Sequence, residues 1–159
     1  MLNAAKKILE SDASNIKDEI SHLEKPIVFT NGCFDILHRG HVSYLETARN
    51  LGGSLIVAVN SDASVKSQNK GSDRPINNQD DRQALLAALE CVDGVIIFNE
   101  DTPLSLITKV TPDVLVKGGD WQVDDIVGAD HVIEHGGQVH SIDFQYDRST
   151  TKLLEKIRA

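Results

Sequence analysis

Hydrophobic residues recur along this chain with two different spacings. From Pro26 onward, short apolar runs of strand length are separated by longer segments in which apolar residues recur with helical periodicity. This alternation is typical of units in which a strand, a crossover helix and a parallel strand follow one another. We therefore expect residues 25–159 to form a Rossmann-like, doubly wound α/β domain with a five-stranded parallel sheet.

The apolar runs and the helix start and stop signals place the individual elements. The expected strands are Ile27–Thr30, Leu55–Val59, Gly94–Phe98, Val114–Lys117 and Gln138–Ile142. The expected helices are His41–Asn50, Gln79–Ala88, Leu104–Val110, Asp124–His135 and Ser149–Arg158. Residues 1–24 carry apolar positions at helical spacing, from Leu2 to Leu23, and predict a helical arm that packs on the domain.

The segment between the second strand and the next helix, Asn60–Asn78, has little apolar content and contains Gly71 and Pro75. It is interpreted as a long loop. Loops of this length in compact domains are usually functional or mobile, so we expect it to act as a lid over a ligand.

Composition narrows the class of protein. A chain of 159 residues is long enough for one hydrophobic core, and no apolar run approaches the ~20 residues of a membrane span. No secretory signal follows Lys6 and Lys7, so we expect a cytoplasmic protein with free thiols at Cys33 and Cys91. A net charge of −8 disfavours nucleic-acid binding, whereas local clusters of basic residues still allow small anionic ligands.

The segment after the first strand carries the strongest chemical signal. Neither common phosphate-binding glycine motif occurs in the chain; instead, His38-Arg39-Gly40-His41 stands at the entrance to a helix. Gly40 allows close approach of the backbone, the helix amino terminus offers N–H groups to an anion, and the two imidazoles add hydrogen-bond donors. An isolated pair like this is more often two exposed histidines at a helix cap, but its position after the first strand favours a phosphate site.

This segment, Gly32 to His41, resembles the first motif of the HxGH nucleotidyltransferase superfamily. The run Arg148-Ser149-Thr150-Thr151 is similar to the Ser-Thr motif of the same superfamily and stands in the right order. Taken alone, Ser149 and Thr150 are ordinary helix caps. Taken with the first motif, they predict two helix amino termini that converge on one triphosphate.

Within the superfamily, residues 25–157 most resemble D-glycero-β-D-manno-heptose 1-phosphate adenylyltransferases, particularly in Asn60-Ser61-Asp62 and in the run Leu115 to Trp121. The resemblance implies transfer of AMP from ATP, with Mg²⁺, to a sugar 1-phosphate, giving ADP-heptose for the lipopolysaccharide core and releasing pyrophosphate. It also implies a separate sugar kinase, because this chain lacks the kinase half to which many such enzymes are fused. We further expect a homo-oligomer, a dimer in the simplest case.

The resemblance and the position of each residue together suggest a role for every candidate. The residues expected to be catalytic are His38, His41 and Lys66. The residues expected to bind ATP are Thr30, Asn31, Gly32, Cys33, Phe34, Gly40, Asn60, Lys117, Gly119, Asp120, Arg148, Ser149, Thr150 and Thr151. Those expected to bind the sugar substrate are Asp35, Arg74 and Trp121, and no residue is expected to bind a metal directly.

Simpler explanations remain open for several of these residues. Lys66 and Lys70 could be solvated charge, Asp35 could hold the turn, and Trp121 could be a core residue. Arg74 and Arg82 could be either loop anchors or helix surface, although Arg82, on the helix after the expected lid, is well placed to hold that lid shut. His131 to His135 fits the H-x-x-E-H pattern of zinc peptidases, but it lies in a crossover helix and few carboxylates follow it, so we interpret it as a chance match.

Two other functions compete with this interpretation. One is another HxGH cytidylyltransferase or adenylyltransferase that acts on a different small phosphate. The other is a nucleotide-binding module that has kept the fold without turnover.

Overall fold

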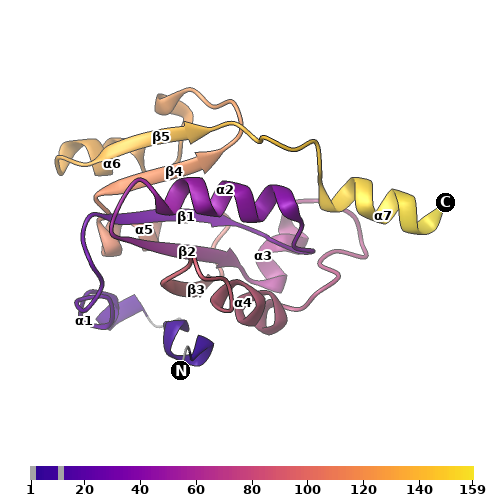
Figure 1. Ribbon diagram of the computed structural model, residues 1–159, viewed down its shortest axis with the longest axis horizontal. Coiled ribbons are helices and arrows are strands. Elements are labelled where there is room, and N and C mark those ends of the chain that lie inside the picture. The colour runs from indigo at the N-terminus through magenta and orange to yellow at the C-terminus, as the bar shows by residue number, and fades with distance from the viewer. Residues whose placement is uncertain (1–2, 11–12) are drawn as a thin grey trace.

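The computed structural model describes residues 3–10 and 13–159. It confirms the expected Rossmann-like architecture, a parallel sheet between two layers of helices (Figure 1). The strands are β1 (Ile27–Gly32), β2 (Ser54–Asn60), β3 (Gly94–Phe98), β4 (Val114–Gly118) and β5 (Gln138–Ile142). The longer helices are α2 (Arg39–Arg49), α4 (Gln79–Ala87), α5 (Leu104–Val110) and α7 (Thr150–Arg158). The shorter ones are α1 (Ile16–Glu19), α3 (Asp62–Ser67) and α6 (Ala129–Glu134), with 3₁₀ turns at Ala4–Lys7, Ala13–Asn15 and Val123–Asp125.

The sheet has the strand order β3-β2-β1-β4-β5, and every neighbouring pair is parallel. The chain builds the sheet outward from β1 to β3 and then crosses back to add β4 and β5 on the other side. The strand order therefore reverses between β1 and β4, which is where doubly wound sheets bind ligands.

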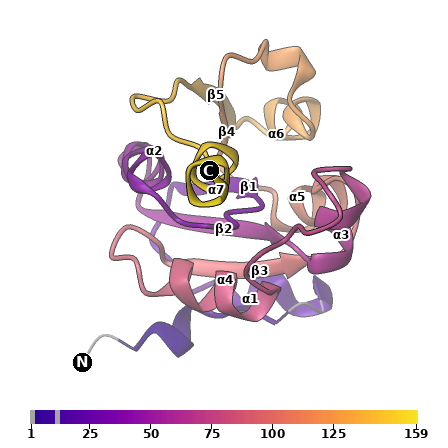
Figure 2. The same cartoon turned by 90° about the vertical axis from the view of Figure 1, so that its right-hand side faces the viewer.

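Each face of the sheet is covered by its own hydrophobic cluster, because neighbouring residues of a strand point to opposite faces. On β1, Val28 points toward α2 and α4, where it packs with Leu45 and Leu86. Phe29, the next residue, points to the opposite face and packs with Ile107 of α5 and Val132 of α6. Figure 2 shows α2 and the pair α5 and α6 on opposite sides of the sheet.

The structure corrects two expected elements between strands. The segment predicted as a loop contains α3, because Ser61 caps a helix by accepting a hydrogen bond from the Ser64 N–H, and Val65 is buried against the domain. The helix predicted over Asp124–His135 is broken. Gly128 has a φ of +86°, which glycine adopts without strain, and it separates a 3₁₀ turn from α6.

The N-terminal segment is less helical than its apolar spacing suggests. Leu2, where the expected arm begins, lies outside the described residues. The described part forms 3₁₀ turns and the four-residue α1, and between them the Leu9 N–H donates to the Val95 carbonyl at the β3 edge. Leu9, Ile16 and Ile20 are buried in the core, so apolar contact with the sheet and α5 outweighs the helical propensity of so short a segment.

The terminal helix α7 projects from the body of the molecule beyond the carboxyl ends of the strands (Figure 1). Its first residue, Thr150, is buried, whereas Ile157 near its end is 74% exposed. Among the residues that the structure describes, no helix has both the length and the apolar character needed to cross a membrane.

Candidate active site

The sheet opens where β1 and β4 approach their carboxyl ends. β1 pairs with β2 along six residues, but with β4 only at Val28–Val114 and Phe29–Leu115. Beyond these pairs, the ends of β1 and β4 are not hydrogen-bonded to each other. The polar residues that follow, Asn31 on β1 and Lys117 on β4, therefore face an opening at the point where the strand order reverses.

The two motif histidines stand at the amino terminus of α2. His38 is the N-cap residue in an extended conformation, and its ring stacks on that of His41 with a centroid distance of 3.8 Å and an interplanar angle of 20°. A Cβ atom on Gly40 would lie 3.0 Å from the His38 ring, so only glycine fits at this position without displacing the ring. The first N–H groups of α2 have no partner within the helix, so they can donate to an anion.

The histidine pair is held in its neutral form. Burial, and to a smaller extent the neighbouring His38 ring, together lower the pKa of His41 to about 4, because two stacked rings cannot easily both be charged. Burial also lowers the pKa of His38, with an added effect from the Arg148 guanidinium. The Nδ1 atoms of both rings are buried and have no hydrogen-bond partner among the described residues.

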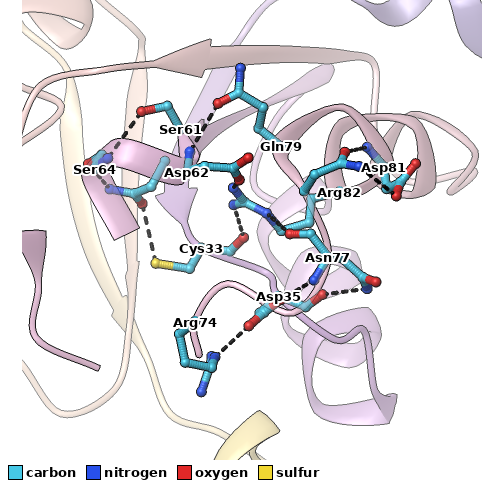
Figure 3. A network of polar contacts seen from close by, with 12 residues as sticks. Cys33, Asp35, Ser61, Asp62, Ser64, Arg74, Asn77, Gln79, Asp81 and Arg82 are labelled. Carbon is cyan, nitrogen blue, oxygen red and sulfur yellow. Dashed lines mark hydrogen bonds and ion pairs between the residues drawn. The ribbon is translucent and has the colours of Figure 1, made fainter. Parts of the chain in front are cut away.

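The turn between β1 and α2 is fixed by a buried carboxylate. Asp35 is 2% exposed; its oxygens accept hydrogen bonds from Arg74 Nε at 2.5 Å and from the N–H groups of Ile76 and Asn77 at 2.9–3.0 Å (Figure 3). Burial alone would raise the pKa of Asp35, but these donors outweigh it and hold the pKa below its usual value. In this arrangement, Asp35 anchors the segment that carries Arg74.

The amino terminus of α7 lies beside the entrance to α2. Ser149 caps α7 by accepting a hydrogen bond from the Lys152 N–H, and the Thr150 hydroxyl lies 3.4 Å from the Ile36 carbonyl in the turn before α2. The Arg39 guanidinium also lies 4.0 Å from the centroid of the Tyr146 ring. Residues far apart in the sequence thus bring two helix amino termini together, as the motifs predict.

Two cavities meet at this point. The larger, of about 350 Å³, is lined by Cys33, Phe34, Asp35, His41, Lys70, Arg74, Thr150 and Thr151. The smaller, of about 160 Å³, is lined by Asn31, Gly32, Cys33, Phe34, His41, Tyr44, Lys117, Gly118 and Phe144. They share Cys33, Phe34 and His41, and together they fall in the range of roughly 300–1,000 Å³ usual for small-molecule sites.

The charges around these cavities suit an anionic ligand. Lys70 and Arg74 line the larger cavity and Lys117 lines the smaller one, whereas the only carboxylate lining either is Asp35, which is already paired with Arg74. Burial lowers the pKa of Lys117, and no carboxylate of the described residues lies within ion-pair distance of its ammonium group. An anion bound here would stabilise the charged form of Lys117.

Several predicted residues line neither cavity. These residues are Thr30, His38, Gly40, Asn60, Lys66, Gly119, Asp120, Trp121, Arg148 and Ser149. Thr30 is buried against Tyr44, with 2.6 Å between the two hydroxyl oxygens, and Lys66 is exposed on α3. Trp121 is 46% exposed and its indole N–H donates to the Gly118 carbonyl, so it is a surface residue rather than part of the core.

Other lining residues were not predicted from the sequence. Tyr44 lies one helical turn after His41, so the helical spacing could have indicated it; burial raises its pKa to about 12. Lys70 was noted in the sequence but assigned no role; it follows α3, whose position determines that Lys70 rather than Lys66 lines the cavity. Phe144, which packs against Gly118 and Tyr44, follows β5 with no motif to mark it.

Two other features of the molecule could compete as candidate sites. A hollow of about 420 Å³ between the N-terminal segment and α4 is lined by residues such as Leu9, Gln83 and Asn99, and it contains neither histidine nor lysine. The rings of His131 and His135 lie 4.2 Å apart, but His131 Nε2 contacts the Thr111 hydroxyl. Within the described ranges, no three or more His, Cys, Asp or Glu side chains are grouped as they would be around a metal ion.

Comparison with known proteins agrees with this geometry. The cytidylyltransferase-like family model matches residues 29–156. The chain is 57% identical to a D-beta-D-heptose 1-phosphate adenylyltransferase of Bordetella bronchiseptica over 86% of this chain and 84% of that protein. It is 59% identical to the bifunctional protein HldE of Pseudomonas syringae pv. syringae over 90% of this chain, which spans only 30% of that protein.

Solved structures of other proteins share this fold. The crystal structure of a lipopolysaccharide core biosynthesis protein from Thermoplasma volcanium superposes with a TM-score of 0.61 and 30% sequence identity, covering 76% of this chain and 98% of that one. A pantoate-beta-alanine ligase from Francisella tularensis, at 14% identity and a TM-score of 0.59, shares the fold over 91% of this chain and 68% of that one. The family match over most of the chain and the motif histidines at the strand-order reversal show that this protein belongs to the cytidylyltransferase-like family.

Proposed function

We propose that this protein is an adenylyltransferase that joins the AMP group of ATP to D-glycero-β-D-manno-heptose 1-phosphate, giving ADP-heptose and pyrophosphate. The observation that carries the proposal is the place of His41, which lines both cavities where they meet. A side chain at that junction can contact the oxygens of a phosphate group that is transferred from a ligand in one cavity to a ligand in the other. The identity of the nucleotide and of the sugar is inferred from the name of the relative in Bordetella bronchiseptica, a D-beta-D-heptose 1-phosphate adenylyltransferase.

The proposed reaction is a single in-line displacement. A phosphate oxygen of the sugar 1-phosphate attacks the α-phosphorus of ATP and forms a new P–O bond. The bond between the α-phosphorus and the oxygen bridging to the β-phosphorus breaks, and its electron pair leaves with pyrophosphate. Such transfers depend mainly on positioning and charge stabilisation, so no covalent enzyme intermediate is needed.

The protein's own groups supply that stabilisation. His41, with His38 stacked on it, offers a neutral imidazole donor, and the first N–H groups of α2 and α7 offer further donors without the cost of burying a charge. Lys70, Arg74 and Lys117 add positive charge on either side of the shared residues. Lys66 on α3, and Arg148 and Trp121 in loops, are further candidates for contact with a ligand from outside the cavities.

The residues present fit a magnesium ion that arrives with the nucleotide. The one carboxylate lining the cavities, Asp35, is occupied by Arg74 and by backbone N–H groups. Mg²⁺ usually keeps several waters and binds to substrate phosphates. We therefore propose that triphosphate oxygens and water hold Mg²⁺, which would neutralise part of the triphosphate charge.

The wider setting of the activity is also a proposal. We propose that a sugar kinase supplies the heptose 1-phosphate and that the product enters lipopolysaccharide core synthesis in the cytoplasm; the chain spans 30% of the bifunctional relatives it matches. A homodimer is the oligomeric state we expect in solution, and sedimentation measurements would test it.

The experiment that tests the function is a pyrophosphate-release assay with ATP or CTP and a panel of sugar 1-phosphates, with the nucleotide sugar identified by mass spectrometry. We expect ADP-heptose with ATP and heptose 1-phosphate, and at least tenfold lower kcat/KM with CTP. A His41→Ala variant controls for contaminating transferases. Preference for CTP would indicate a cytidylyltransferase, and nucleotide binding without any product would indicate a binding module.

A further inference from the structure

Arg82 is a fully buried arginine that lines neither cavity. It lies on α4, and its guanidinium donates hydrogen bonds to three segments of the chain (Figure 3). Nη1 donates to the Cys33 carbonyl at 2.7 Å, Nε to the Asn77 carbonyl at 3.0 Å, and Nη2 to Asp62 Oδ1 at 2.9 Å. One side chain thus links the turn after β1, the segment after α3 and the start of α3 itself.

The turn held by Arg82 has an unusual backbone. Phe34 has a φ of +49°, in the left-handed region that a residue with a bulky side chain rarely adopts. Such a conformation persists only where the surrounding structure holds it in place. Arg82 holds the carbonyl of Cys33 on one side of Phe34, and the donors to the Asp35 carboxylate hold the other side.

The left-handed turn determines where the Phe34 ring lies. The ring meets His41 edge to face, with 5.2 Å between centroids and an interplanar angle of 64°. On its other side, the ring packs so closely on Gly32 that a Cβ atom there would lie 2.9 Å from it. The ring therefore lies between β1 and the imidazole and shields part of His41 from water.

We propose that Arg82 is a positioning residue for His41: by holding the Cys33 carbonyl, it keeps the Phe34 backbone left-handed and the Phe34 ring against the imidazole. The chain of contacts runs from the guanidinium to the Cys33 carbonyl, through the Phe34 backbone and ring, to His41. The catalytic meaning of this role rests on the proposed function, but the contacts belong to the protein without ligand. A test on the free protein therefore separates the two.

The decisive variant is Arg82→Lys. Lysine keeps the positive charge beside Asp62 but cannot reproduce the planar fork that serves three acceptors at once. We expect the Cys33–Phe34 turn to relax and water to reach His41. The His41 pKa, measured by NMR titration in the free protein, should then rise from about 4 toward 6.5. In the assay, kcat should fall roughly 10- to 100-fold, as for a catalytic group displaced by about 1 Å, with a smaller change in the KM for ATP.

Arg49→Lys is the matched control. Arg49 also forms an ion pair and a carbonyl contact, to Asp93 Oδ2 and the Gly52 carbonyl at 2.8 Å each, but at the opposite end of α2. The same chemical change there should leave the His41 titration unaltered. If Arg82→Lys folds and His41 titrates as in the parent, or if Arg49→Lys shifts it equally, the proposal is wrong.

A second variant covers the case in which Arg82→Lys does not fold. Phe34→Ala removes the ring through which the effect is transmitted and should raise the His41 pKa by itself; an unchanged pKa would overturn the proposal. Where both variants fold, the double variant Arg82→Lys with Phe34→Ala should shift His41 no further than the larger single change. Additive shifts would contradict transmission through Phe34. An inactive parent protein would contradict the proposed function and leave these titrations interpretable.

Discussion

His38 and His41 lie ring against ring at the entrance to α2, each with a buried Nδ1 atom that lacks a hydrogen-bond partner among the described residues. Such atoms are costly to bury, so a group with this arrangement is usually kept for what it binds. We therefore expect the other ring nitrogen, Nε2, to be the atom through which these side chains contact a phosphate. Gly40 supports this arrangement because its missing side chain leaves room for the His38 ring.

The first prediction concerns these two side chains. His38→Ala and His41→Ala should each lower kcat by roughly 10²–10³, the usual cost of losing one transition-state donor. The melting temperature should change little, because removing either ring also removes a buried Nδ1 atom that has no hydrogen-bond partner and therefore costs stability. Steady-state kinetics alongside thermal melting checks this, and near-normal turnover in either folded variant would remove that histidine from the mechanism.

At the scale of elements, the segment after β2 has a firmly held part and a loosely held part. α3 and residues 74–77 are tied to the domain through Arg82 and Asp35, whereas residues 68–73, between them, are exposed throughout. In the loosely held part, Lys70 and Gln68 contact the Cys33 thiol. We therefore expect only the short stretch that carries Lys70, and not the whole of Asn60–Asn78, to act as a lid.

The second prediction follows from this division. Trypsin should cut the free protein after Lys70, and ATP with Mg²⁺ should slow that cut several-fold, because Lys70 lines the larger cavity and a bound triphosphate would hold it. Cleavage after Lys109 in α5, which lies on the other face of the sheet, is the internal reference. Equal rates of cleavage after Lys70 with and without nucleotide would show that this stretch does not act as a lid over the ligand.

The third prediction concerns the amino terminus of α7. The double change Ser149→Ala with Thr150→Ala removes both hydroxyls while keeping the half-buried Leu153 and Leu154 side chains of α7. Loss of the Ser149 cap should cost about 0.5–2 kcal/mol, which lowers the melting temperature by only a few degrees in a chain of this size. ATP affinity, measured by calorimetry, should fall at least tenfold. Unaltered affinity in the folded variant would return Ser149 to a plain capping role.

At the scale of the whole molecule, burying neutral histidines links folding to pH. The folded-state pKa of His41, about 4, lies below the ordinary value of 6.5, so the unfolded chain binds more protons between these two values. The part of the stability that is linked to His41 is therefore fully present above about pH 6.5 and is lost as the pH falls toward 4. Asp35, whose pKa is lowered from its usual value of 3.8, adds a further loss of stability only at still lower pH.

The fourth prediction is the shape of this pH profile. The free energy of unfolding, measured with urea from pH 7.5 to 4.5, should decrease on acidification in the parent protein. His41→Gln should flatten the decrease, because it removes a group that takes up a proton on unfolding. A variant whose profile runs parallel to that of the parent would show that His41 is not the group responsible.

The sequence alone determined the sheet, because buried parallel strands require short apolar runs and crossover helices require a longer periodicity. It also indicated the histidine pair and the Ser149–Thr150 cap, because phosphate chemistry requires such residues at helix entrances. These features depend on the sequence of residues within short stretches of the chain. They were predictable without knowing which segments lie side by side.

Only the tertiary structure decided what depends on contacts between distant segments. α3 forms because Val65 finds a buried position, and Lys70 rather than Lys66 lines the cavity because of where α3 ends. Phe144 reaches the site because β5 lies beside β4, and Arg82 is buried because three separate segments offer it acceptors. Burial and hydrogen-bond partners are properties of the packed molecule, and no spacing in a single sequence encodes them.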